Sequence, residues 1–292
     1  MALTKIDANE LNSNVYNVVG PYRNRLINGG MRVAQRATSA TVTAGTAVPT
    51  ASTGYPCVDR WYVYSTGANV TAAQVAGTGA DKNRLQITGA ASVTAVGIGQ
   101  RIEQNNSYDL AGGNATLAVD LSNSLLTTVT WTAYYANTAD TFGTVGTPTR
   151  TQIATGTFTV SSTLTRYTAS FAVPAAATTG IEVVFTVGAQ TSGTWVVGNV
   201  QLEAGLVASS FEQRSYGQEL TLCQRYYSTV TAQIPASTSP TKSIFYKTSM
   251  KAAASIAGGG AGFTTSNSTT ESVDCVQTAT ANQTLTFSSE LP

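Results

Sequence analysis

Strict alternation of apolar and polar residues dominates the middle of the chain. The stretch TTVTWTAYY places Val129, Trp131 and Ala133 on one face, and threonines together with Tyr134 on the other. A side-chain period of two is typical of a half-buried β-strand. The same pattern recurs at residues 59–65, 83–89, 164–174, 181–188 and 194–205. About nine such strands, roughly ten residues apart and without helical periods between them, predict an all-β fold, an antiparallel β-sandwich or jelly roll.

The first residues follow a different period. Within residues 1–23, Leu11, Val15 and Val18 recur at helical spacing, which predicts a short helical arm. An apolar face this short cannot bury itself alone. The arm either packs on its own domain or docks onto a neighbouring subunit or an assembly. The three apolar residues are therefore candidates for assembly and attachment.

A short helix is expected to follow the sandwich. Ser215 and Gln218 fit the capping box S-x-x-Q, in which the serine hydroxyl and the glutamine amide satisfy free backbone N–H groups at the start of a helix. Leu220, Cys223 and Tyr227 then fall at i, i+3 and i+7, on one apolar stripe. The helical connector is therefore predicted to span residues 215–228.

These patterns divide the chain into four segments. They are an attachment arm (1–23), a jelly-roll sandwich (24–214), the helical connector (215–228) and a small C-terminal β domain (229–292). The last segment alternates again in KSIFYKTSMK and QTLTFSSEL but has few large apolar side chains. A unit of roughly 65 residues with so little apolar surface is expected to gain stability from the sandwich or from symmetry copies of itself.

The charge balance excludes two classes of partner. Sixteen basic and 15 acidic residues leave a net charge of +1, and no Lys/Arg stripe interleaves with aromatic residues. Phosphate neutralisation, which dominates nucleic-acid affinity, therefore has no source. No apolar run approaches the roughly 18 residues of a membrane span. We expect no nucleic-acid partner and no membrane insertion.

The residue types also limit the chemistry. The chain has no histidine, which removes Ser–His–Asp, Cys–His and H-E-x-x-H sites. Its three cysteines, at wide spacings, form neither a disulfide framework nor a zinc motif. We expect no cofactor and no metal, although Asp109, Asn114 and Asp120 offer the hard oxygen atoms that calcium prefers. An ordinary Asp/Gly turn explains the same three residues.

Catalysis by carboxylates alone is the enzymatic alternative. Glycoside hydrolysis needs only two carboxylates, so the absence of histidine does not exclude it. The acidic residues are scattered singly along the chain, with no adjacent pair. We therefore expect a protein that is not an enzyme.

Aromatic residues are the candidates for ligand binding. Tyr62, Tyr64 and Tyr134 lie on strand faces that the alternation points away from Trp61 and Trp131. A tyrosine flanked by threonine, asparagine and glutamine suits a sugar ring, which has an apolar face and hydroxyl groups at its rim. The three tyrosines are therefore candidate carbohydrate-binding residues. The alternative is that both faces of their sheet are covered.

Several segments together resemble a known family. They are NRLINGGMRVAQR, VDRWYVYS, IGQRIEQ, LTRYTASFAVP, VQLEAGLVASSFEQRSYGQELTLCQRYY and YKTSMKAAASIAG, with SSEL near the end. In this order they are similar to tail-fibre and receptor-binding proteins of tailed bacteriophages, which have a carbohydrate-binding-module-like jelly roll. The chain departs from the family at three places: Ser210 stands where the family usually has proline, Ser215 stands where it often has one, and KAAAS lacks the customary proline of the tip.

The resemblance implies a function. Such proteins are usually homotrimers that attach to other tail or baseplate proteins and meet a host-surface polysaccharide or lipopolysaccharide. It therefore implies a non-enzymatic fibre or receptor-binding subunit, assembled in the host cytoplasm and located at the tail or baseplate periphery of the virion. Two alternatives stay open: a tailspike that depolymerises glycans, and a purely architectural fibre that decorates the capsid or tail.

Overall fold

The computed structural model describes residues 22–79, 81–234, 242–258, 263–277 and 281–292. The predicted arm, with Leu11, Val15 and Val18, lies outside the described residues. No helix in the described ranges is long and apolar enough to cross a membrane.

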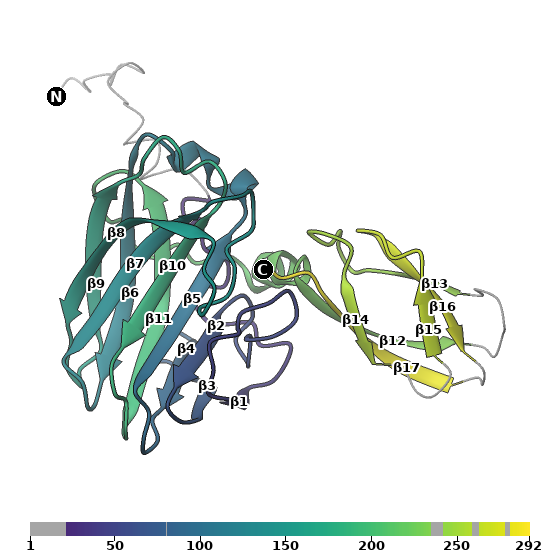
Figure 1. Cartoon of the computed structure of the whole chain (residues 1–292), viewed down its shortest axis with the longest axis horizontal. Helices are drawn as coiled ribbons and strands as arrows, with labels where there is room; N and C mark the ends of the chain where they lie inside the picture. Colours follow the sequence, from purple (N-terminus) through teal and green to yellow (C-terminus); the bar gives the residue numbers. More distant parts are fainter. Residues whose placement is uncertain (1–21, 80, 235–241, 259–262, 278–280) are drawn as a thin grey trace, which may run out of the picture.

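Two antiparallel sheets form the larger part of the chain (Figure 1). The six-stranded sheet has the order β1 (Ser39–Val42), β3 (Val70–Ala76), β4 (Asn83–Thr88), β11 (Thr194–Ala204), β6 (Asn114–Asn123), β9 (Thr165–Ala172). The five-stranded sheet has the order β2 (Tyr62–Thr66), β5 (Ala95–Ile102), β10 (Ile181–Val187), β7 (Thr128–Ala136), β8 (Arg150–Thr159). The predicted all-β antiparallel sandwich is confirmed.

The core lies between the two sheets. Val129, Trp131 and Ala133, the apolar face predicted for β7, are all buried. Trp131 stacks on Phe171 of the opposite sheet, with ring centroids 5.4 Å apart. Burying a large apolar side chain contributes roughly 1.5–3 kcal/mol. The alternation in sequence therefore fixes which face of each strand turns inward.

A turn at residues 28–31 anchors the N-terminal segment to β11. The Asn28 backbone is left-handed, with φ of 57°, and its side-chain oxygen accepts a hydrogen bond from Val33 N at 3.0 Å. The backbone N–H of Val200 donates to Gly29 O at 3.0 Å. A Cβ atom added at Gly29 would collide with the carbonyl oxygen of Val200, so this approach of two backbones requires glycine.

The connector helix is shorter than predicted. Helix α2 (Tyr216–Gln224) begins as expected, because Ser215 accepts a hydrogen bond from Gln218 N at 3.3 Å. It ends before Tyr227, which already belongs to β12. The physical reason is a tertiary contact: the Tyr226 side chain is fully buried and its hydroxyl donates to Glu103 Oε1 at 2.5 Å. Anchoring Tyr226 there draws the chain out of the helix.

The C-terminal unit is a small sandwich of two three-stranded sheets. One sheet contains β12 (Tyr227–Ile234), β17 (Ala281–Ser288) and β14 (Ser255–Gly258), and the other contains β13 (Lys242–Phe245), β16 (Ser272–Gln277) and β15 (Phe263–Ser266). Tyr246 packs on Phe287 with ring centroids 4.7 Å apart, and Met250, Val273 and Leu285 are buried beside them. The unit therefore encloses an apolar core of its own.

The last residues of the chain return to the larger sandwich. Arg101 Nη1 donates to Leu291 O at 2.9 Å, and Phe142 N donates to Pro292 O at 2.7 Å. The C marker in Figure 1 accordingly lies beside α2, between the two units. Hydrogen bonds to the last backbone carbonyls therefore tie the end of the chain to the larger sandwich.

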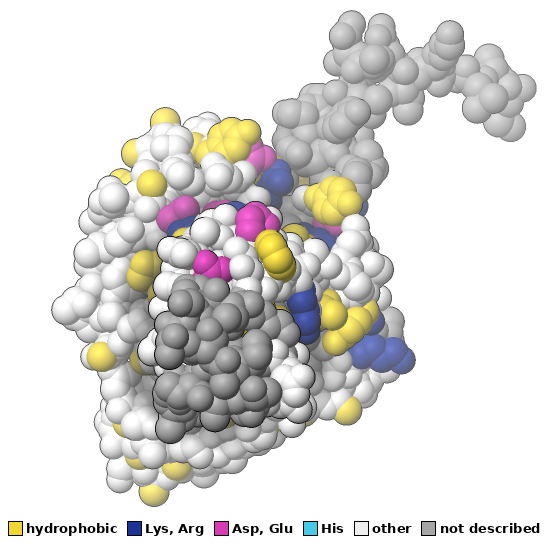
Figure 2. Space-filling view, turned by 90° about the vertical axis from the view of Figure 1, so that its right-hand side faces the viewer, with side chains coloured by type: hydrophobic (Ala, Val, Ile, Leu, Met, Phe, Trp, Pro, Cys, Tyr) yellow, Lys and Arg dark blue, Asp and Glu magenta, His cyan; other side chains and the backbone are white. Residues whose placement is uncertain are grey.

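On the side that bears the C-terminal unit, charged side chains form small groups on a mostly uncharged surface (Figure 2).

Candidate functional site

The three predicted tyrosines share the outer face of the five-stranded sheet. Tyr134 lies opposite Glu182 in the β7–β10 register, and Tyr62 and Tyr64 lie opposite Gly99 and Gly97 of β5. Directly paired residues point to the same side of a sheet. We name this surface the tyrosine face and define it by its outward side chains: Tyr62, Tyr64, Arg101, Tyr134, Arg150, Glu182.

Tyr62 cannot contact a ligand, because its side chain is 0% exposed. Its ring meets Tyr55 edge to face, with centroids 6.3 Å apart, and its hydroxyl donates to Glu182 Oε1 at 2.9 Å. Burial raises the pKa of Tyr62 to about 12, although the nearby Arg150 and Arg101 act in the opposite direction. The expectation that Tyr62 is exposed is therefore wrong: it points outward from the sheet, but Tyr55 and Glu182 cover it.

Glu182 organises the charges of the tyrosine face. This buried carboxylate accepts from Arg101 Nε at 2.8 Å and also forms an ion pair with Arg150. The Arg150 guanidinium in turn lies over the ring of Tyr134, 4.2 Å from its centroid. Because a buried carboxylate needs partners, Glu182 fixes both arginines, and Arg150 fixes the plane of the Tyr134 ring.

The Tyr64 ring is positioned by close packing on Gly97, not by an ion pair. A Cβ atom added at Gly97 would collide with the Tyr64 ring, so the ring lies directly over the backbone of β5. Tyr64 and Tyr134 are both half-buried, which leaves part of each ring at the surface. Burial raises the pKa of Tyr64 further above its ordinary value of 10.0, so its hydroxyl, which is protonated at neutral pH in any case, remains a hydrogen-bond donor. The face therefore presents two oriented phenol rings.

Hydroxyl and amide groups surround the two rings. Thr132 and Thr155 share a hydrogen bond of 3.0 Å between their hydroxyls, and Thr130 lies opposite Thr157 on the same face. Gln152 lies opposite Tyr134 and is exposed. Aromatic rings with uncharged hydrogen-bonding groups at their rim form a surface that suits polyhydroxylated ligands.

The acidic residues that the sequence offered for calcium are in separate ion pairs. Asp109 binds Arg25 at 2.5 Å, and Asp120 binds Arg166 at 2.9 Å. Within the described ranges, no group of three or more His, Cys, Asp or Glu side chains is arranged to hold a metal ion.

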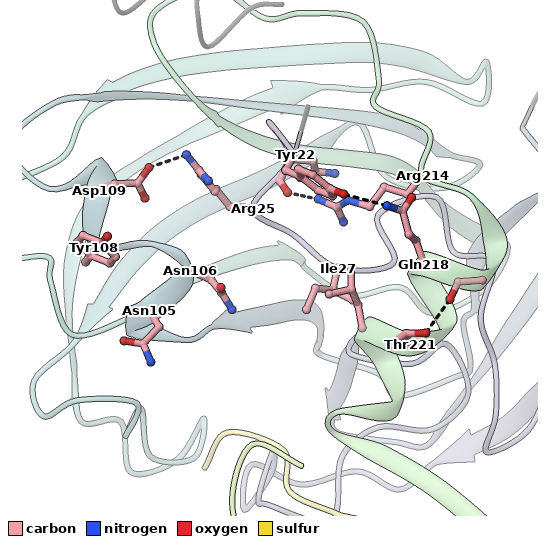
Figure 3. A pocket seen from close by; sticks show the side chains of 13 residues that line it. Tyr22, Arg25, Ile27, Asn105, Asn106, Tyr108, Asp109, Arg214, Gln218 and Thr221 are labelled. Carbon is pink, nitrogen blue, oxygen red and sulfur yellow. Dashed lines mark hydrogen bonds and ion pairs between the residues drawn. The ribbon is translucent and has the colours of Figure 1, made fainter. Parts of the chain in front are cut away.

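A pocket of about 700 Å³ lies beside the connector helix, at a place that the sequence did not indicate (Figure 3). We call it the connector pocket. Its walls come from residues 22–27, from two short 3-10 helices, η1 (Gln104–Asn106) and η2 (Tyr108–Leu110), and from α2 with Arg214 before it. Three segments so far apart in sequence share no motif. The only sequence signal is an aromatic–amide run, QNNSYD, at residues 104–109.

No protein-family model matches this chain, and no curated protein sequence matches it. Solved structures with similar folds include a chain described as "CBM4 structure and function", with 12% identity and a TM-score of 0.40 over 61% of this chain and 98% of that one. A second is the enzymatically active domain of tailspike protein 4 from bacteriophage CBA120, with 19% identity and a TM-score of 0.38 over 66% of this chain and 23% of that one.

A third similar structure is TmCBM61 in complex with β-1,4-galactotriose, with 12% identity and a TM-score of 0.38 over 63% of this chain and 99% of that one. All three similarities have TM-scores below 0.5 and therefore say nothing about which ligand this chain binds. The class of the protein, an all-β antiparallel sandwich with a second, smaller β-sandwich, follows from strand order and register.

Proposed function

We propose that the chain is a non-enzymatic adhesion subunit of a phage tail fibre, and that it binds host-surface glycans through the tyrosine face. The observation that carries the proposal is the pair Tyr64 and Tyr134, two half-buried rings oriented on one outward face beside Arg150 and a rim of threonines. The sequence resemblance, strongest from Val200 to Tyr227, supports the placement in a fibre.

The physical basis is the match between a pyranose and this surface. The apolar face of a sugar ring stacks on an aromatic ring, while its hydroxyls need donors and acceptors at the edge. Tyr64 and Tyr134 supply the rings, and Gln152 and the threonines supply the hydrogen bonds. A shallow face of this kind corresponds to weak binding, with a Kd on the order of 1 mM or about −4 kcal/mol. Several linked copies raise the avidity without new contacts.

The tyrosine face is proposed to bind glycans without cleaving them. Hydrolysis of a glycosidic bond uses two carboxyl groups about 5–9.5 Å apart. On the tyrosine face, Glu182 is buried and paired with both Arg101 and Arg150. Both of its oxygens are already bonded, Oε1 to Tyr62 and Arg101 and Oε2 to Arg150, which favours a binding role.

The test is a glycan array of capsular and lipopolysaccharide oligosaccharides, followed by titration of the best ligand. Tyr64→Ala and Tyr134→Ala are each expected to weaken binding about tenfold, the loss of one aromatic contact. Tyr216→Ala, which removes a 50% exposed tyrosine on α2, is the matched control and should leave binding unchanged.

Three results would contradict the proposal. Unchanged glycan affinity in both Tyr64→Ala and Tyr134→Ala would exclude the tyrosine face as the binding site. Release of reducing ends, abolished by Glu182→Gln, would assign a depolymerase. A protein that enters particles normally but binds no glycan would have an architectural role.

A further inference from the structure

The walls of the connector pocket are held in place by hydrogen bonds between segments that are far apart in sequence. Arg214 Nη1 donates to Leu26 O at 3.0 Å, and Glu219 Oε1 accepts from Asn28 N at 2.5 Å. Glu212 accepts from the backbone N–H groups of Tyr22 and Asn24 at 2.8 and 2.7 Å. Polar contacts between α2, the segment before it and residues 22–28 therefore form the pocket before any ligand arrives, which lowers the entropic cost of binding.

Two exposed tyrosines border the cavity. Tyr22 is 57% exposed and accepts a hydrogen bond from Gln218 Nε2 at 3.0 Å. Tyr108 is 60% exposed and lies on the side of the cavity opposite α2 (Figure 3). Exposed phenol rings on a rigid concave surface supply flat apolar contact area together with a polar tip.

The polar groups around the cavity divide into two sets. The charged ones are neutralised: Arg25 binds Asp109 at 2.5 Å, and Arg214 binds Glu219 at 3.4 Å. The uncharged ones include the side-chain amides of Asn105 and Asn106 and the hydroxyl of Tyr108, which have no hydrogen-bond partner among the described residues. Free donors and acceptors without net charge select an uncharged, hydrogen-bonding ligand.

We propose that the connector pocket is a second saccharide site, which takes a neutral sugar at the end of a glycan chain. The Tyr108 ring is its stacking platform, and Asn105 and Asn106 bind its hydroxyl groups. A volume of about 700 Å³ lies within the range of small-ligand sites, about 300–1,000 Å³. A concave pocket encloses a chain end, whereas the tyrosine face lies on the outer side of a sheet and contacts a chain along its length. The two sites share no residue.

The experiment uses the full chain and four probes: the neutral trisaccharides of glucose, galactose and mannose, and trigalacturonate. Saturation-transfer NMR detects binding, and titration gives Kd. At least one neutral trisaccharide is expected to bind and trigalacturonate to bind more weakly. Tyr108→Ala should weaken the neutral ligand about tenfold, and Asn106→Ala about fivefold, the loss of one hydrogen bond. Thr221→Trp, on the exposed surface of α2, should block the pocket.

Two controls test whether the effect is confined to the pocket. Tyr216→Ala removes an exposed tyrosine of α2 that does not line the pocket, and Phe245→Ala removes a 71% exposed ring on β13, in the C-terminal unit. Both should leave trisaccharide binding unchanged. Absence of binding by all three neutral probes, preference for trigalacturonate, or an unchanged Kd in Tyr108→Ala would overturn the proposal. A change of oligomeric mass in Tyr108→Ala, measured by light scattering, would also overturn it, because the pocket would then be a protein interface.

Discussion

The guanidinium carbon of Arg60 lies 3.5 Å from the centroid of the Tyr226 ring, and both side chains are only 1% exposed. Arg60 lies in the loop before β2, and Tyr226 lies between α2 and β12. The same guanidinium forms a buried ion pair with Glu290, just after β17. The sandwich, the connector and the C-terminal unit therefore meet at one desolvated cation.

Removing the carboxylate of this cluster should destabilise the protein strongly. Glu290→Gln leaves the Arg60 charge buried without its anion, a loss of about 3–5 kcal/mol. Arg36 also loses one of its two carboxylate partners, Glu290 at 3.2 Å, and keeps Asp59 at 3.6 Å. The measurement is the free energy of unfolding from urea titration. Glu271→Gln, at an exposed carboxylate, is the matched control and should change stability by less than about 0.5 kcal/mol.

The double replacement Arg60→Met with Glu290→Leu separates charge from packing. Exchanging a buried ion pair for apolar side chains of similar volume is often neutral or stabilising. The double variant should therefore recover most of the stability lost in Glu290→Gln. A double variant no more stable than the single one would show that packing around Tyr226, rather than charge, holds the junction.

Asp59 should make the protein less stable as pH rises. Burial raises the pKa of its carboxyl from 3.8 to about 6, although Arg36 and Gln35 act in the opposite direction. Between pH 4 and pH 6 the folded state holds a proton that the unfolded state has lost, so the contribution of Asp59 to stability falls across that window. From pH 4 to pH 7, the stability of Asp59→Asn relative to wild type should rise by about 2–3 kcal/mol. Parallel pH profiles of unfolding would contradict this assignment.

Glu103 should show the opposite dependence. Burial raises the pKa of its carboxyl, but hydrogen bonds from Arg225 and Tyr226 outweigh burial and hold the pKa below its ordinary value. Its contribution to stability is therefore complete at neutral pH and is lost as pH falls through the acidic range. Glu103→Gln should cost about 1–3 kcal/mol at pH 7 and less at pH 3. A cost that grows on acidification would show that the sign is wrong.

Local patterns predicted the strands and the start of the helix. The alternation around Trp131 gave the correct inward face because a strand with one buried side fixes its own register. Ser215 and Gln218 are three residues apart, so the capping box was visible in the sequence. The end of α2 was not, because it depends on Tyr226 reaching Glu103, a partner 123 positions away.

The candidate site was predictable only in part. Period-two alternation placed Tyr64 and Tyr134 on an outward face, and their common sheet then brought them together. It could not show that Tyr55 and Glu182 bury Tyr62. The connector pocket was invisible for the same reason, since its walls meet only in the folded chain. The sequence therefore indicated the side of each strand but not what covers it.

Oligomerisation is expected from the proposed fibre role. The purified protein should have three times its monomer mass of 30.2 kDa in light scattering at micromolar concentration. Truncation of residues 1–21 should reduce that mass if the predicted arm associates copies. A particle of monomer mass at all concentrations would argue against a trimeric fibre.

A substitution at Gly97, which lies under the Tyr64 ring, tests whether the orientation of that ring matters for glycan binding. Gly97→Ala places a Cβ atom where the Tyr64 ring now lies, so the ring must move off β5. Overpacking of this kind costs about 1–3 kcal/mol. Because the displaced Tyr64 ring is no longer positioned to stack on a sugar, glycan affinity should fall about as far as in Tyr64→Ala. Gly188→Ala adds the same methyl group where no atom lies within 4 Å, so stability and affinity should both stay at wild-type values. Loss of stability with unchanged glycan affinity would mean that Tyr64 only covers the glycine and takes no part in binding.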